Sequence, residues 1–324
     1  MNTSAINFLK GILIFLVVFG HFLEAARNIF LVNYIYNFIY TFHMPAFAFV
    51  SGYLAKGGKS VDFEKIIKKL VIPLVLFNTL FEVNNYISNG SVSWYIKQGA
   101  PYWILWYLVS LVSWKLLSPI IMRFKYPMLV SLLIFISFQY INLDGYFLSV
   151  MRTVNFLPFY ISGCCLFCYR QKYTFTFLHW ENKLLFFFMS VIVLMLIAGK
   201  VNADFLYRAL PLEIQSCDPF TFYIVSLVIL LSVSFLSYVI INSRLHCSLF
   251  ERFGGGSMGI YLVHGFLVKW VPADIYKNIT FHTLIPTALI VSLVVCFLLS
   301  SSFANNLINS ICNGIGKLCL PNHE

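Results

Sequence analysis

Long hydrophobic runs, separated by short polar stretches, extend from one end of this chain to the other. Each run approaches the length of about 20 residues that an α-helix needs to cross a bilayer. The pattern predicts about ten membrane-spanning helices, at approximately 5–25, 33–55, 69–88, 102–122, 127–142, 150–169, 183–199, 220–241, 257–271 and 283–308. We therefore expect an all-α fold, a polytopic transmembrane helical bundle that forms one domain over residues 1–324.

The composition excludes a soluble globular protein. Hydrophobic residues make up 60% of the chain and charged residues only 10%, whereas soluble domains carry about 25% charged residues. The first run, at 5–25, is not followed by a small-residue cleavage site, so we expect it to be a retained span rather than a signal peptide.

The net charge of +10 is explained by lysines and arginines in the loops. If the N-terminus is cytoplasmic, the predicted inner loops and C-terminal tail carry about twice as many of these residues as the outer loops, as the positive-inside rule requires. We therefore expect both termini in the cytoplasm, membrane lipids around the bundle, and no nucleic-acid partner.

Of the eight cysteines, three lie in "CCLFC" at 164–168, which contains one CxxC spacing. The segment lies inside an apolar run, where free cysteine packs as a small hydrophobic residue. We expect no metal site.

Ionisable residues inside the predicted spans are the candidates for function, because a charge in the bilayer is costly. Lys10 and His21 are eleven residues apart, which places them on one face of a helix and about 16 Å apart along its axis. Glu24 follows His21 by three residues on the same face. A carboxylate beside an imidazole fixes its tautomer, so His21 can serve as a general base for a hydroxyl group. The alternative is that Lys10 extends to the membrane surface and His21 bonds a neighbouring helix.

The segment "FHMPAFAFVSGYL" at 42–54 places His43 one residue before Met44-Pro45. Proline removes a backbone donor and kinks a helix, which opens space for a ligand beside the histidine. A packing kink with a hydrogen-bonded histidine is the alternative.

Three lysines, Lys65, Lys68 and Lys69, gather at the start of the predicted span 69–88. They indicate either ordinary anchoring at the inner surface or a phosphate-binding patch. The glycines in "RFGGGSMGIYLVHGF" at 252–266 are not a P-loop, because no Gly-Lys-Ser/Thr follows, and we expect a flexible turn before a helix. The other ionisable candidates are Glu82, Arg152 and His264.

Several of these segments occur together in an order that is typical of one family. They are "KGILIFLVVFGH" (10–21), "FHMPAFAFVSGYL" (42–54), the lysine cluster running into "LVIP", "WILWYLVSL" (103–111), "RTVNFLPFYISGCCL" (152–166) and "GSMGIYLVH" (256–264). In this set the chain resembles the acyltransferase-3 family of integral membrane O-acyltransferases, especially its fucose 4-O-acetylase-like bacterial branch. The family often has arginine where this chain has Lys10, and two arginines where it has the lysine cluster.

The resemblance implies a reaction in which acetyl-CoA in the cytosol supplies an acetyl group to a sugar hydroxyl across a bacterial inner membrane. The acceptor would be a surface glycan, such as capsule, O-antigen or a lipid-linked sugar precursor. We then expect His21 and Glu24 to be catalytic. The residues expected at the acetyl-CoA donor are Lys10, His43, Lys65, Lys68 and Lys69, and those expected at the acceptor are Glu82, Arg152 and His264.

Two other classes share the many spans. A secondary transporter or lipid-linked glycan flippase would use intramembrane His and Glu to relay protons, but no inverted repeat of the kind common in transporters is evident. A glycan polymerase would normally have a large outward loop, and the segment at 200–219 is short for one.

Overall fold

A computed structural model describes residues 3–141, 146–172, 180–207, 218–271 and 280–319 of this chain. Over these ranges the chain is built from helices, and no β-strand occurs in them. The α-helices are α1 (Thr3–Leu23), α2 (Phe30–Leu54), α3 (Phe63–Ile66), α4 (Ile72–Asn89), α5 (Trp94–Lys97), α6 (Trp106–Ile121), α7 (Pro127–Phe138), α8 (Val150–Lys172), α9 (Trp180–Ala198), α10 (Pro219–Asn242), α11 (Ser248–Gly255), α12 (Ser257–Trp270), α14 (Phe281–Leu299) and α15 (Ser302–Cys319). The short 3-10-helical segments are η1 (Glu24–Ala26), η3 (Trp103–Leu105), η4 (Phe147–Ser149) and η5 (Ala203–Leu206), and η2 (Ile67–Val71) is a short π-helix.

The prediction of an all-α bundle is confirmed, and each predicted span overlaps at least one helix in the described ranges. Five helical segments are long and apolar enough to cross a membrane by themselves: Thr3–Ala26, Trp103–Ile121, Phe147–Arg170, Pro219–Asn242 and His282–Leu299. Two shorter apolar helices, Pro127–Phe138 and Asn182–Ala198, accompany them.

The predicted span at 283–308 is wrong at its C-terminal end. Helix α14 stops at Leu299, and α15 begins at Ser302 as a separate helix. The Ser300 hydroxyl donates to the Phe297 carbonyl, a local bond that competes with continuation of the helix. Beyond this break, asparagines are interspersed among apolar residues, so α15 is amphipathic. It packs against α4 and α12 instead of continuing α14.

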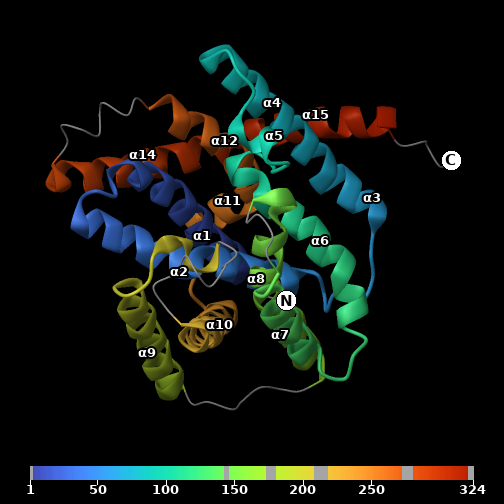
Figure 1. The fold of residues 1–324 in the computed structure, drawn as a ribbon, viewed down its shortest axis with the longest axis vertical. Coiled ribbons are helices and arrows are strands. Elements are labelled where there is room, and N and C mark those ends of the chain that lie inside the picture. Colours follow the sequence, from blue (N-terminus) through green and yellow to red (C-terminus); the bar gives the residue numbers. More distant parts are fainter. Residues whose placement is uncertain (1–2, 142–145, 173–179, 208–217, 272–279, 320–324) are drawn as a thin grey trace.

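Helix α1 lies in the middle of the bundle, with α7, α9 and α10 on one side and α4, α12 and α15 on the opposite side (Figure 1). Its closest partner is α11, which the sequence analysis missed. A β-carbon added to Gly11 would lie 1.8 Å from the Phe250 carbonyl oxygen, and one added to Gly254 would lie 1.9 Å from the Asn7 carbonyl oxygen. The glycine turn expected before a helix is present only at Gly256, which separates α11 from α12. Gly254 and Gly255 are the last two residues of α11, and the backbone at Gly254 touches α1.

Helices α2 and α8 meet in the same way. A β-carbon at Gly52 would lie 1.8 Å from the Tyr160 carbonyl oxygen, and one at Gly163 would lie 2.0 Å from the Phe49 carbonyl oxygen. Membrane helices associate through such small residues, because close backbone approach increases van der Waals contact. The expected kink does not end α2, which continues through Pro45 to Leu54.

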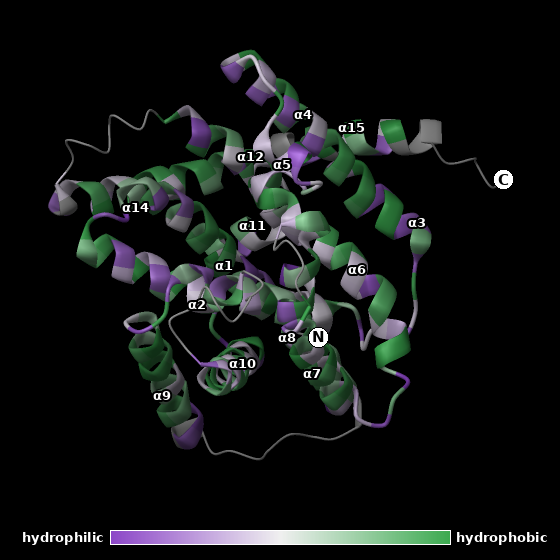
Figure 2. Ribbon diagram, in the orientation of Figure 1, coloured by the Kyte–Doolittle hydropathy of each residue, from purple (hydrophilic) through white to green (hydrophobic). Residues whose placement is uncertain are grey.

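The outside of the bundle is strongly apolar. Hydrophobic residues, coloured green, predominate along the ribbons of α7, α9 and α10 (Figure 2). Side chains on α9 and α10 such as Leu196, Phe220 and Leu231 are more than half exposed. In water so many exposed apolar side chains would drive aggregation. They indicate a lipid-facing surface.

Gly254 and Gly255 give a matched test of the α1–α11 contact. We expect Gly254→Ala to lower the melting temperature of detergent-purified protein, since overpacking costs about 1–3 kcal/mol. Gly255→Ala is the control, because nothing lies within 4 Å of its added β-carbon. Equal melting temperatures for the two variants would contradict the backbone contact.

Candidate functional site

A polar cavity, about 800 Å³ with the space open to solvent included, is lined by residues of α1, α2, α5, α6, α8 and α12 and of the short segments η1, η3 and η5. We call it the histidine cavity. It brings together four residues singled out from the sequence: His21, Glu24, His43 and Arg152. The other ionisable carboxylate in its wall is Asp204.

His21 is held by two partners through one ring nitrogen. Its Nδ1 lies 3.0 Å from Glu24 Oε2 and 3.3 Å from the Tyr40 hydroxyl, and its side chain is 12% exposed. Glu24 can only accept when ionised, so this contact places the His21 proton on Nδ1. The Nε2 atom then carries the lone pair, and no hydrogen bond from the described part of the chain reaches it. This is the arrangement of a base oriented by a carboxylate.

His43 and His264 are also held in one tautomer, by the backbone of their own helices. His43 Nδ1 donates to the Ile39 carbonyl at 2.7 Å, and His264 Nδ1 donates to the Ile260 carbonyl at 2.9 Å. Each ring therefore presents an unprotonated Nε2. The His264 ring lies 5.5 Å from that of His21, and its buried Nε2 has no hydrogen-bond partner among the described residues.

Aromatic side chains form most of the remaining wall of the histidine cavity. They are Tyr36, Tyr40, Tyr95, Trp103, Trp106, Tyr146, Tyr207 and Tyr261. The Trp103 ring lies 4.7 Å from that of His21, and its backbone has a φ of 31°, a region that bulky residues rarely adopt. Such strain is characteristic of residues held in place at a functional site.

Arg152 borders the same cavity. Its Nε donates to the Tyr207 carbonyl at 3.1 Å, and its guanidinium lies 4.9 Å from the centre of the Tyr146 ring and 5.5 Å from that of Trp106. No ion pair links Arg152 to a carboxylate within the described ranges. Its terminal nitrogens are therefore available to a ligand.

A second, mostly apolar cavity of about 640 Å³ adjoins the first, and Lys10 lies in its wall. We call it the apolar cavity. It also reaches Leu54 at the end of α2 and Ser257 at the start of α12. It shares three lining residues with the histidine cavity: Val17, Met44 and Tyr261. The face of α1 that carries Lys10 and His21 thus follows two adjoining cavities.

A third cavity of about 700 Å³, the basic cavity, lies beside the end of α2 and is lined by Lys65, Lys69 and Lys115. Lys65 is paired with Asp62 at 2.7 Å. The hydrogen bond from Lys65 lowers the pKa of the Asp62 carboxyl and raises the pKa of the Lys65 ammonium, so the pair stays charged around neutral pH. Lys69 and Lys115 have no carboxylate partner in the described ranges and leave the cavity positive.

Three predicted site residues, Lys68, Glu82 and His264, line none of these cavities. Lys68 pairs with Glu64 at 2.6 Å and does not line the basic cavity. The Glu82 carboxylate accepts hydrogen bonds from the backbone and hydroxyl of Ser93, the residue before α5. It therefore holds the helix that carries Tyr95 into the histidine cavity, without lining that cavity.

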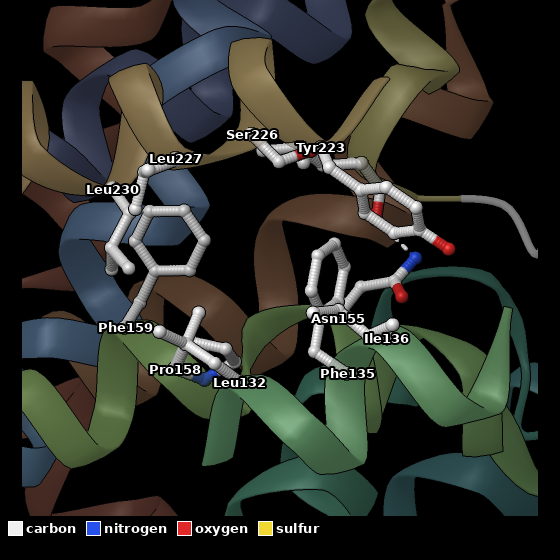
Figure 3. Close-up of a pocket in the computed structure, with 11 residues that line it drawn as sticks. Leu132, Phe135, Ile136, Asn155, Pro158, Phe159, Tyr223, Ser226, Leu227 and Leu230 are labelled. Atoms are coloured by element: carbon white, nitrogen blue, oxygen red, sulfur yellow. Dashed lines mark hydrogen bonds between the residues drawn. The ribbon is translucent and has the colours of Figure 1, made fainter. Parts of the chain in front are cut away.

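A separate cavity of about 570 Å³ lies between α7, α8 and α10 (Figure 3). Phe135, Phe159 and Leu230 are among its mainly apolar lining residues. Asn155 donates to the Leu206 carbonyl at its edge. It contains none of the residues selected from the sequence.

Sequence reasoning missed Lys115, Asp204 and the aromatic wall. The sequence gives no reason to select Lys115 or Asp204, and tyrosines in an apolar run carry no signal that separates a cavity wall from a packed core. They are recognised only once the folded structure brings helices that are distant in sequence around each cavity. Among the described residues, no group of three or more His, Cys, Asp or Glu is placed to hold a metal ion.

Comparison with known proteins gives one family and one curated relative. A family model described as an acyltransferase domain, that of the acyltransferase-3 family, matches residues 3–301. The nodulation protein NolL of Sinorhizobium fredii (strain NBRC 101917 / NGR234) is 30% identical over 148 residues, and the match covers 40% of this chain and 40% of the relative. No solved structure matches the chain.

The tautomers of His43 and His264 can be measured. In protein labelled with ¹³C,¹⁵N-histidine, we expect both rings to give the chemical shifts of the Nδ1–H form, because backbone carbonyls accept from Nδ1. His43→Asn and His264→Asn variants assign the two signals. An Nε2–H form at either position would contradict the described hydrogen bonds.

Proposed function

This chain belongs to the acyltransferase-3 family, and from that premise we propose that it is a membrane O-acetyltransferase. It takes an acetyl group from cytosolic acetyl-CoA and delivers it to a sugar hydroxyl of a surface polysaccharide, either capsule, O-antigen or a lipid-linked precursor. The observation that carries the proposal is the His21–Glu24 pair, which leaves His21 Nε2 as a free base inside a cavity that adjoins the one containing Lys10.

The proposed chemistry needs one base and no redox step. The sugar hydroxyl loses its proton to His21 Nε2, its oxygen attacks the thioester carbonyl, the C–S bond breaks, and the proton leaves with the CoA thiolate as the free thiol. Glu24 stabilises the imidazolium that forms, because its carboxylate lies 3.0 Å from Nδ1. A transient acetyl-His21 would use the same nitrogen as nucleophile.

The donor is proposed to enter at the end of the bundle that carries the lysines. Phosphates of CoA would meet Lys69 and Lys115 in the basic cavity. Lys65 and Lys68 would contribute less, because Asp62 and Glu64 balance their charges. The pantetheine arm would then extend past Lys10 through the apolar cavity toward His21. The distance of about 16 Å between Lys10 and His21 along α1 is on the scale of that arm.

The acceptor is proposed to bind in the histidine cavity. Its aromatic wall offers flat faces to sugar rings, and Arg152 offers a polar partner. His264 does not line the cavity, and its proposed part in the acceptor site is to pack beside His21, whose ring lies 5.5 Å away. His43 lies in the same cavity as His21, so it is positioned to contact the thioester end of the donor. Glu82 contributes by holding Ser93 and thereby α5.

The cellular setting follows from the charge distribution. With the lysine-rich end in the cytoplasm, both termini lie inside and the histidine cavity opens toward the outer half of the membrane. The protein would then be a multi-pass protein of the bacterial inner membrane.

His21 is the decisive residue for the test. In a deletion strain, we expect wild-type protein to restore the O-acetyl signal of the surface polysaccharide in proton NMR spectra. We expect His21→Ala to restore none of it, because the substitution removes the base that Glu24 orients. Immunoblots of membrane fractions provide the control for equal amounts of protein.

Two results would reject the proposal. One is equal acetylation in the deletion and wild-type strains. The other is loss of the whole polysaccharide on deletion, which would favour a flippase or a polymerase.

The basic cavity gives a second prediction. We expect Lys69→Ala and Lys115→Ala each to raise the KM for acetyl-CoA by about tenfold, since a charge-assisted hydrogen bond is worth about 1.5–3 kcal/mol. Lys125→Ala is the matched control, because this exposed lysine lines none of the described cavities. An equal KM for acetyl-CoA in all three variants would show that this cavity does not bind the phosphates of CoA.

A further inference from the structure

The histidine cavity and the apolar cavity meet at only three of their lining residues, which are Val17 on α1, Met44 on α2 and Tyr261 on α12. We call these three the passage residues. They are contributed by three helices and line both the cavity that contains Lys10 and the one that contains His21. Val17 lies one helical turn before His21 on the same face of α1.

Two of the passage residues are fixed. The Tyr261 hydroxyl donates to the Ile104 carbonyl, and its ring lies 6.1 Å from the ring of Tyr107, which is itself bonded to Ser51. Val17 is 4% exposed, and its branched side chain has few rotamers in a helix. Neither side chain can move aside without breaking a contact.

Met44 is the adjustable member. It is 7% exposed and follows His43, whose ring is anchored to the Ile39 carbonyl. An unbranched side chain with three rotatable bonds fills an irregular gap and changes shape at low cost. The free width of the passage is therefore set by the rotamer of Met44 against two rigid walls.

We propose that the passage residues select the acyl group by its length, with Met44 as the main determinant. This inference rests on the proposed function, in which a thioester approaches His21 from the apolar cavity. For its carbonyl carbon to reach His21 Nε2, the acyl group must pass Val17, Met44 and Tyr261 first. A two-carbon acyl group then needs little displacement of Met44, whereas each further methylene competes with that side chain for the same space.

The test compares acyl donors with one protein preparation. Purified protein in proteoliposomes receives acetyl-, propionyl- or butyryl-CoA together with the native polysaccharide after mild alkaline removal of its O-acyl groups, and mass spectrometry counts the acyl groups transferred. We expect wild-type protein to prefer acetyl. Met44→Ala is expected to raise the butyryl-to-acetyl ratio by about tenfold or more, because one methylene in an apolar site is worth 10–200-fold in selectivity.

Met258→Ala is the matched control. Met258 is also a methionine beside Tyr261 in the wall of the apolar cavity, but it does not line the histidine cavity. We expect this substitution to leave the ratio of butyryl to acetyl transfer at the wild-type value. Val17→Ala widens the passage from the opposite wall and is expected to shift the ratio in the same direction as Met44→Ala, so the test survives if one variant does not fold.

The outcomes separate the two proposals. Acetyl transfer by wild type, with unchanged acyl ratios in both Met44→Ala and Val17→Ala, overturns the length filter and leaves the O-acetyltransferase intact. An equal shift in Met258→Ala also overturns it, because the effect would then come from the apolar cavity in general. Absence of transfer from every donor by wild-type protein overturns the proposed function and the filter with it.

Discussion

Contact between helix backbones is the constraint on which the rest of this structure depends. In lipid, helices gain little from burying apolar side chains, so their association relies on close packing. Gly11 and Gly254 bring α1 against α11, and Gly52 and Gly163 bring α2 against α8. The candidate site draws on α1, α2 and α8 for His21, His43 and Arg152. Its geometry is therefore set by contacts more than a turn away from the cavity.

Much of the fold could be predicted from hydrophobic runs alone, because the length of a span is a strong signal. The run at 283–308 shows the limit. Its apolar character continues past Leu299, but the helix breaks where the Ser300 hydroxyl bonds the Phe297 carbonyl. The pattern then becomes amphipathic, and α15 is a separate helix. The glycines at 254–256 show another limit, since a glycine needed for helix contact and one needed for a turn look alike in a sequence.

The candidate site was predictable where it depends on one helix. The spacing of Lys10, His21 and Glu24 places them on one face, and the structure places Glu24 on His21 Nδ1. It was not predictable where helices far apart in sequence meet. Asp204 lines the histidine cavity and Lys115 lines the basic cavity because of how the helices pack in three dimensions. Glu82 does not line the histidine cavity, because its carboxylate is bonded to Ser93. Sequence spacing contains no information about these distances.

The junction of the two cavities has a consequence for the membrane itself. In the proposed orientation the two cavities approach each other from opposite sides of the bilayer, and a continuous path of water between them would leak protons and small ions. The junction offers water few hydrogen-bonding groups. Val17 and Met44 are apolar, and the Tyr261 hydroxyl is already bonded to the Ile104 carbonyl. Narrow apolar constrictions exclude water and block ion passage by dewetting. The same three side chains would thus act as an electrical seal, which lets a catalyst stay embedded in an energised membrane without discharging it.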